Sequence, residues 1–209
     1  MLKRIATALW GKFESTAELK KFGFLAAIFG FIIGTYWTLR PMKDSIFNAI
    51  VGMDYLPWAK MLSLVVIFPL VIAYSKLIDK YPRHKVFYIL ISIYACASLL
   101  FCVAFLNATL GLVNTVQSPW RLIGWAWYVF VESFGSLIVA LFWAFTTDTT
   151  KPDSAKRGFP IIVLFGQVGN ILGPLLLNAR RLGFANSAPV VAICAGLMVF
   201  SGLLFCKIT

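Results

Sequence analysis

Six long apolar stretches dominate this chain of 209 residues and limit the folds that are open to it. Each is close to the roughly 20 residues that a helix needs to cross the hydrocarbon layer of a membrane. Hydrophobic residues make up 60% of the chain and charged residues 13%, whereas soluble domains are about 45–50% apolar and about 25% charged. A soluble domain of this size could not bury so much apolar surface. We therefore predict an all-α integral membrane protein, a bundle of six transmembrane helices.

The predicted helices follow the apolar stretches. Residues 1–21 are predicted to form an amphipathic segment on the cytoplasmic face of the membrane, since the segment contains both basic and apolar residues. Residues 22–209 are predicted to form the six-helix transmembrane domain. The first span begins near Phe22 and its end depends on Pro41, and the others are expected over 56–78, 86–107, 122–147, 158–179 and 182–206.

Lysine and arginine are concentrated on one side of this arrangement. The N-terminal segment, the loop between spans two and three and the loop between spans four and five hold twelve of the nineteen basic residues. Cytoplasmic loops of membrane proteins carry such an excess. Both termini are therefore predicted to be cytoplasmic, and the net charge of +11 is explained without a nucleic-acid partner.

The chain carries no motif of an enzyme, a metal site or a cofactor site. Its four cysteines fall within the predicted spans and lack metal-ligand spacing, and His84 is its single histidine. A phosphate-binding glycine loop, a nucleophile elbow and paired catalytic carboxylates are all missing from the sequence. We predict a protein that is not an enzyme and that needs no cofactor.

A cluster of charges interrupts the first apolar stretch. Arg40, Lys43 and Asp44 stand where a span would end, yet apolar residues resume at Ile46. A helix end with snorkelling side chains explains the charges but not the apolar residues beyond them. If Pro41 kinks the helix instead of ending it, Arg40, Lys43, Asp44 and Phe47 fall at i, i+3, i+4 and i+7 and form one stripe. Such a stripe is expected to face an aqueous interior.

Other polar residues lie within predicted spans. Glu132 has ten uncharged residues before it and fifteen after it, and an ionisable group near the bilayer centre costs about 2.5–3.5 kcal/mol on insertion scales. It should face a cavity or a cation, in a functional role or as a structural ion pair. Gln167 and Asn170 share one face of the fifth span, as cavity-lining groups or as packing contacts. Gly169-x-x-x-Gly173 in the same span would allow a close helix approach.

The loop after the second span carries a partial family motif. Asp79, Lys80 and Arg83 in "SKLIDKYPRHK" resemble the loop between spans two and three of the major facilitator superfamily, although Ser75 and Pro82 stand where glycines are usual. A solvated basic loop that obeys the topology rule is the alternative explanation.

Three segments together resemble a more specific family. The segments are "TLRPMKDSIFNAIVG", "VFVESFGSLIVALFWAFTTDTT" around Glu132, and "GFPIIVLFGQVGNILGP". They are similar to the non-mitochondrial ATP/ADP translocases of plastids and obligate intracellular bacteria, and the similarity extends over about residues 20–206. The resemblance implies a major-facilitator-like fold and exchange of ATP for ADP by alternating access. It also implies that Lys43 and Glu132 match two charged positions needed for transport.

The nucleotide chemistry suggests roles for the other candidates. Arg40 and Lys43 would contact the phosphates, since arginine grips phosphate bidentately and lysine acts as a point charge. Asp44 and Glu132 would keep these cations ordered in the empty site. Tyr36, Trp37 and Tyr128 are candidates for stacking on adenine, and Gln167 and Asn170 for hydrogen bonds to the base or ribose.

The chain departs from the family in length, because family members have about twice as many spans. We therefore expect a second six-span half, or another copy, to meet it along spans one, two, four and five, beside its lipid and nucleotide partners. The expected location is a bacterial inner membrane or the plastid inner envelope. A proton-driven importer of nucleotides or of another organic anion remains open, as does a scaffold that transports nothing.

Overall fold

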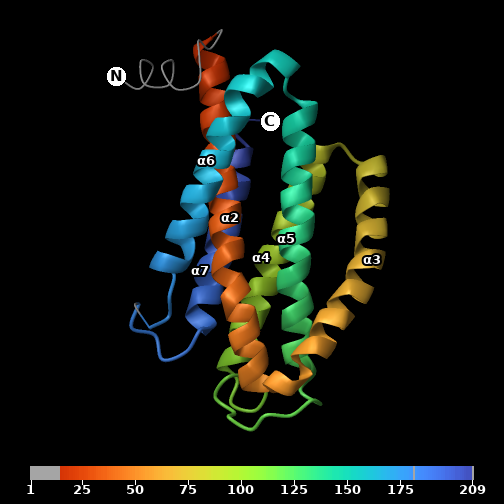
Figure 1. Cartoon of the computed structure of the whole chain (residues 1–209), viewed down its shortest axis with the longest axis vertical. Helices are drawn as coiled ribbons and strands as arrows, with labels where there is room; N and C mark the ends of the chain where they lie inside the picture. The colour runs from red at the N-terminus through yellow and green to blue at the C-terminus, as the bar shows by residue number, and fades with distance from the viewer. Residues whose placement is uncertain (1–14, 181, 209) are drawn as a thin grey trace.

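The structure, a computed structural model, describes residues 15–180 and 182–208 and contains six long helices in this part of the chain (Figure 1). They are α2 (Thr16–Ile50), α3 (Leu56–Lys80), α4 (Arg83–Leu106), α5 (Leu122–Asp148), α6 (Pro152–Leu176) and α7 (Ala188–Phe205), with a short 3₁₀ helix η1 (Met53–Tyr55) before α3. Each of the six is long and apolar enough to cross a membrane. The prediction of an all-α bundle with six transmembrane helices is confirmed.

Helix α2 is the longest element and passes through Pro41 without ending. Its first turn is capped by Ser15, whose hydroxyl accepts a hydrogen bond from the Glu18 amide at 3.0 Å. With 35 residues it measures roughly 52 Å, well beyond a hydrocarbon layer of about 30 Å. The alternative in which α2 stops at the charge cluster is therefore wrong.

Several predicted boundaries differ from the structure, among them both ends of the fifth span, since α6 covers Pro152–Leu176. The division after Lys21 falls inside α2, which already begins at Thr16; residues 1–14 lie outside the described part of the chain, so the amphipathic segment stays a prediction. The last span begins at Ala188 rather than Leu182. Residues 178–180 and 182–184 form hydrogen-bonded turns instead, with Gly183 at a φ of 74°, a backbone conformation that glycine adopts readily.

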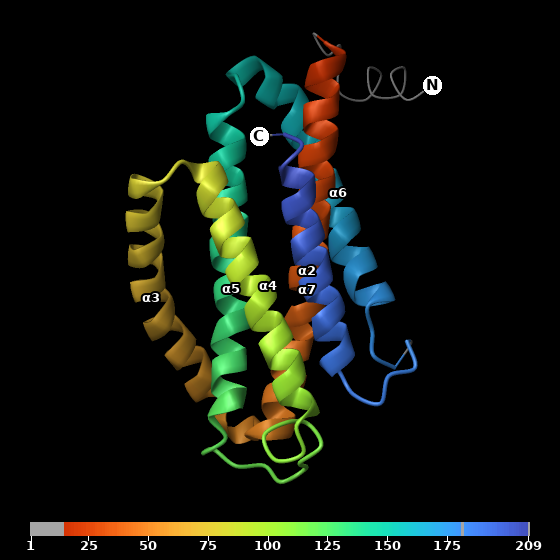
Figure 2. The ribbon, with the colours of Figure 1, turned by 180° about the vertical axis from the view of Figure 1, so that it is seen from behind.

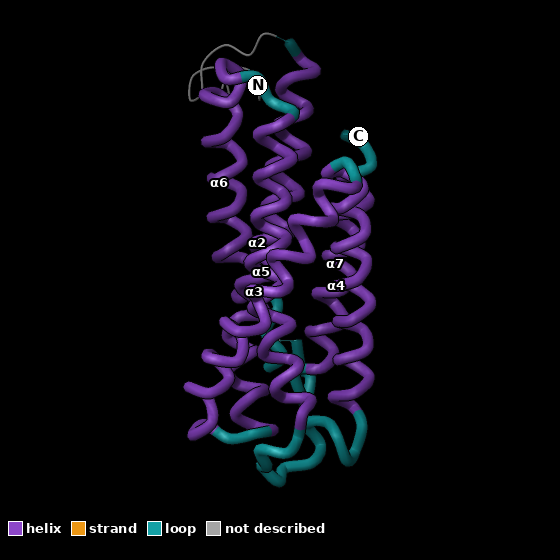
Figure 3. The backbone as a smooth tube through the Cα atoms, turned by 90° about the vertical axis from the view of Figure 1, so that its right-hand side faces the viewer, coloured by secondary structure: helices purple, strands orange, loops and turns teal. Residues whose placement is uncertain are grey.

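The helices form two layers. Helices α3, α5, α2 and α6 lie side by side in the front layer of Figure 1, and α4 and α7 pair behind them (Figures 2 and 3). Helix α2 is central, since it packs against α5, α6 and α7. Helix α3 contacts mainly α5 and buries only Ala59 and Ser63. The front layer thus keeps an open face, and it consists of the four spans that the sequence predicted to meet a second unit.

Glycines set the contact between α2 and α6. A Cβ atom at Gly169 would collide with the carbonyl oxygen of Gly30, and one at Gly173 would collide with the carbonyl oxygen of Gly34. The two backbones therefore touch, as the spacing of Gly169 and Gly173 predicted.

Both ends of the chain's described part lie at one end of the bundle. The beginning of α2 and the end of α7 are at the top of Figure 1, and the 107–121 loop is at the bottom. Contacts between distant segments hold the upper end together: Arg157 pairs with Glu18 at 3.1 Å, and the Lys21 ammonium donates to the Thr149 carbonyl oxygen. The segments with the basic excess meet at this end, as the distribution of lysine and arginine indicated.

The glycine contact leads to a stability prediction. Gly169→Ala should lower the free energy of unfolding in detergent by about 1–3 kcal/mol, since the added methyl group forces the α2 backbone away. Gly196→Ala in α7 is the matched control, because a Cβ there meets nothing within 4 Å, and it should be neutral or stabilising. Equal effects of the two substitutions, measured by reversible denaturation, would contradict the assigned contact.

Candidate functional site

The continuous α2 helix carries the charge cluster into the bundle. Lys43 is the most buried charged residue in the described chain, with 4% of its surface exposed. Its neighbours Phe47 and Ile46 are also buried, whereas Arg40 is exposed. The expected single stripe is therefore divided, because Lys43 and Phe47 turn toward α5 while Arg40 and Asp44 lie closer to the open face.

Lys43 meets the one carboxylate that α5 carries within its apolar part. Its ammonium forms an ion pair and a hydrogen bond with Glu132 Oε1. The nitrogen also lies 4.2 Å from the ring centroid of Tyr128, one turn before Glu132 on the same helix. A cation over an aromatic face is stabilised by the ring quadrupole. The glutamate side chain keeps 29% of its surface exposed, so the pair borders accessible space.

Tyr128 differs from the expectation that it stacks on adenine. Its ring is 1% exposed, and its face contacts Lys43 while its edge packs near Phe47, with the ring centroids 5.5 Å apart. A fully covered ring offers no free face to a base. The sequence could not indicate this, since the distance between residues 43 and 128 along the chain hides the contact.

Asp44 and Arg40 lie at the rim of this buried pair. Asp44 Oδ1 is 3.8 Å from Lys43 Nζ, and the Asp44 side chain is about half exposed (48%). That oxygen has no hydrogen-bond partner among the described residues. The Arg40 guanidinium lies 4.9 Å from the Trp37 ring centroid and 5.9 Å from that of Tyr36. The two rings thus pack against the exposed Arg40 side chain, and the N–H groups of its guanidinium stay accessible.

Tyr36 and Trp37 are both half-buried and adjoin each other, with ring centroids 6.1 Å apart. Tyr36 also packs against the backbone of α5, because a Cβ at Gly135 would collide with its ring. The structure thus brings Lys43 together with Asp44 and Glu132, and groups the two rings with Arg40 on α2.

Gln167 and Asn170 lie apart from this cluster, on α6. Gln167 is exposed and Asn170 partly so, and the Asn170 amide lies 3.5 Å from Gln167 Oε1. They share a face, as predicted. No contact joins them to Lys43 or Glu132 in the described residues, so they form a separate polar group.

The sequence did not reveal the polar contacts that tie the helix ends. Arg83 pairs with Asp148 at 2.6 Å and donates to the Ala144 carbonyl oxygen at 2.7 Å, which joins α4 to α5. Arg121 donates to the carbonyl oxygens of four residues in the loop before α5: Leu110, Gly111, Asn114 and Val116. The position of Arg83 in the motif-like loop was a signal for the first contact, and no sequence signal pointed to the second.

Comparison with known proteins identifies the family. The profile of the family described as TLC ATP/ADP transporter matches residues 2–206. The chain belongs to this family. The family is one of transporters and not of enzymes, in agreement with the sequence prediction. No solved structure matches the chain significantly.

Curated relatives carry corresponding names. The chain is 26% identical over 185 residues to ADP,ATP carrier protein 4 of Rickettsia conorii, covering 79% of this chain and 36% of the relative. It is 29% identical over 181 residues to ADP,ATP carrier protein 5 of Rickettsia prowazekii, covering 77% and 36%. It is 31% identical over 179 residues to ADP,ATP carrier protein 1 of Rickettsia bellii, covering 76% and 35%. The chain spans about a third of the length of these relatives.

The ion pair leads to a second prediction. Glu132→Gln should lower the free energy of unfolding by about 1–3 kcal/mol, because it leaves the Lys43 ammonium buried without its counter-charge. Adding Lys43→Met should recover most of the loss, since the cation is then removed as well. Asp44→Asn is the control, and this half-exposed carboxylate should contribute within about 0.5 kcal/mol. Additive effects of the Glu132 and Lys43 changes in a double-mutant cycle would contradict the pairing.

Proposed function

We propose that this chain is the N-terminal six-helix half of a membrane transporter that exchanges ATP for ADP. Membership of the TLC ATP/ADP transporter family and the names of the curated relatives support this proposal. The single structural observation that carries it is the buried Lys43 ammonium, held by Glu132 at the border of the open face. A cation in that position suits a polyanionic substrate.

Nucleotide phosphates would bind through the cations of α2. A transporter must replace the water around several negative charges by protein groups inside a region of low dielectric constant. Arg40, whose flat face lies near Trp37 at 4.9 Å, keeps its N–H edge free for two parallel hydrogen bonds to a phosphate. Lys43 lies one turn further along α2 and would supply a second, more buried positive charge.

Glu132 would act as the counter-ion that the substrate replaces. In the empty site its carboxylate neutralises Lys43, so the cation can stay inside the membrane at low cost. A phosphate that enters would compete for the same ammonium, and Glu132 would reclaim it when the nucleotide leaves. Asp44, 3.8 Å from Lys43, would assist in the same way. This exchange of partners prevents both an uncompensated charge and a permanently bound anion.

A second six-helix unit would complete the site, in the same polypeptide or as another copy. Transporters of the major facilitator type bind substrate between two six-helix bundles, near the middle of the membrane. Here α2, α3, α5 and α6 leave an open face that carries Arg40, Asp44 and part of Glu132. The other unit would cover this face and provide further charges. Gln167 and Asn170 would contact the base or ribose from α6.

The orientation and location follow from the basic residues. The end of the bundle where α2 begins and α7 ends would face the cytoplasm, since it carries most of the lysines and arginines. The membrane would be the inner membrane of a bacterium or the inner envelope of a plastid.

Cysteine labelling tests this orientation. In a variant without the four native cysteines, Thr115→Cys should react with a membrane-impermeant maleimide on intact cells. Lys80→Cys should react only after the membrane is opened, because its loop lies on the cytoplasmic side. The reverse pattern would overturn the orientation, while leaving the transport proposal intact.

Transport measurements on the complete transporter test the roles of the two charges. Lys43→Ala should weaken ATP binding by about ten-fold or more, since a desolvated anion loses its counter-charge. Lys43→Arg should recover part of the affinity, because a guanidinium differs from an ammonium in shape and hydration. Glu132→Gln should slow exchange more than it weakens binding, and Glu132→Lys should have the largest effect of all.

Binding and exchange must be measured separately for each variant in proteoliposomes. Lys60→Ala on exposed α3 is a control for general loss of positive charge and should behave like the wild type. Near-normal binding and exchange in both Lys43→Ala and Glu132→Gln would mean that the pair is structural and that the nucleotide binds elsewhere.

A further inference from the structure

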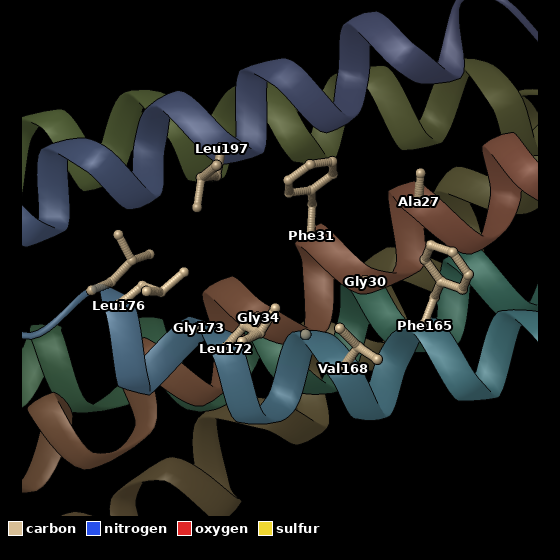
Figure 4. Close-up of a pocket in the computed structure, with 12 residues that line it drawn as sticks. Ala27, Gly30, Phe31, Gly34, Phe165, Val168, Leu172, Gly173, Leu176 and Leu197 are labelled. Atoms are coloured by element: carbon tan, nitrogen blue, oxygen red, sulfur yellow. The ribbon is translucent and has the colours of Figure 1, made fainter.

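A long apolar groove runs along α6 on the side that faces α7. Its volume is about 360 Å³, within the range of pockets that hold small ligands, which begins at about 300 Å³. Figure 4 shows Phe31 and Leu197 on one side of it, and Val168, Leu172 and Leu176 on the other. No charged side chain lines it.

The glycine contact between α2 and α6 forms the floor of the groove. Gly30 and Gly34 of α2 and Gly169 and Gly173 of α6 all line it, and their backbones touch. Because these four glycines have no side chains, the groove is deep where the two helices meet, and the larger side chains of its lining form its walls. The same residues that bring the two helices together therefore leave the hollow beside them.

The groove lies away from the face that the second transporter unit would cover. On α6, Leu172 lines the groove, while Asn170 is two positions earlier and about 200° around the helix. Gln167 is three positions before Asn170 and shares its face. The polar side of α6 and the groove thus point in different directions.

An exposed arginine follows the last residues of the groove lining in the sequence. The lining ends at Leu176 and Leu177, where α6 stops, and Arg180 follows within one turn of chain. Arg180 is exposed. An arginine just beyond an apolar groove lies at the level where lipid phosphates meet the end of a transmembrane helix.

We infer that this groove is a binding site for an anionic phospholipid of the bilayer. One acyl chain lies between α6 and α7 over the glycine floor, and the phosphate pairs with Arg180. From Phe165 to Leu177 the lining covers roughly 18 Å of helix, a length that suits an extended hydrocarbon chain. A groove of this volume and length is too narrow to hold an α-helix, which is about 10–12 Å wide.

Native mass spectrometry of the purified chain in detergent, with phosphatidylglycerol added, tests the proposal. The wild type should bind one tightly held phosphatidylglycerol per chain. Leu172→Trp, which fills the groove, should weaken this binding by about ten-fold. Ile171→Trp is the matched control, because Ile171 is the adjacent exposed residue and does not line the groove; it should bind as the wild type does.

Arg180→Gln tests the contact with the lipid headgroup separately from the groove. Because Arg180 is exposed, this substitution leaves the packed interior unchanged. It should weaken phosphatidylglycerol binding by about five-fold, close to 1 kcal/mol for one cation near an anionic headgroup. Binding of diacylglycerol, which lacks the phosphate, should not change. Circular dichroism must confirm that each variant keeps its helical content.

Three results would overturn the inference. One is equal phosphatidylglycerol binding by Leu172→Trp and Ile171→Trp. Another is an unchanged affinity in Arg180→Gln. The third is a dimer that Leu172→Trp alone dissociates, since a second copy would then occupy the groove in place of lipid. The nucleotide proposal is independent of these outcomes, because none of these residues belongs to the α2–α5 cluster.

Discussion

The ion pair between Lys43 and Glu132 is the interaction on which the arrangement of α2 and α5 depends. A charged group near the middle of a membrane costs about 2.5–3.5 kcal/mol on insertion scales, and the buried Lys43 of α2 faces Glu132 of α5. Bringing them together cancels both charges and places the ammonium over the Tyr128 ring. Because the pair keeps its carboxylate partly exposed, the contact that stabilises the bundle is also the contact that a phosphate could open.

The two sides of α6 illustrate how one helix serves two environments. Its glycines let it touch α2 along one line, and its remaining surface is divided between a polar side with Gln167 and Asn170 and an apolar side that borders the groove. In the proposed half-transporter, this division would let one side of α6 meet water and a partner unit while the other meets lipid. Helix α3 also leaves most of its surface exposed, since it packs little against its neighbours. It lies beside α5, at the opposite edge of the front layer from α6.

The sequence predicted the helices well because apolar runs of the right length leave few alternatives in a membrane. It also indicated that α2 passes Pro41, since Ile46 to Val51 needed a place in the bundle, and that Glu132 needs a cation. It did not predict that Tyr128 lies beneath Lys43 or that Arg83 pairs with Asp148. Such contacts depend on how each helix is rotated about its own axis. A span in which nearly all residues are apolar gives no pattern from which that rotation can be predicted. The predicted start of α7 was wrong because Leu182 and Phe184 are apolar and read as part of the span, although both lie in turns before the helix.

If this six-helix unit holds half of a nucleotide site, as we propose, exchange requires a second half, and reconstitution tests this directly. The chain should be placed in liposomes alone and together with a second six-helix unit from a relative of the family, and ATP uptake against internal ADP should be measured. We expect exchange only in the combined vesicles, and its loss there when Lys43 is replaced by alanine. Full exchange by the chain alone as a monomer, or exchange in the combined vesicles that persists with Lys43→Ala, would contradict the proposed half-site.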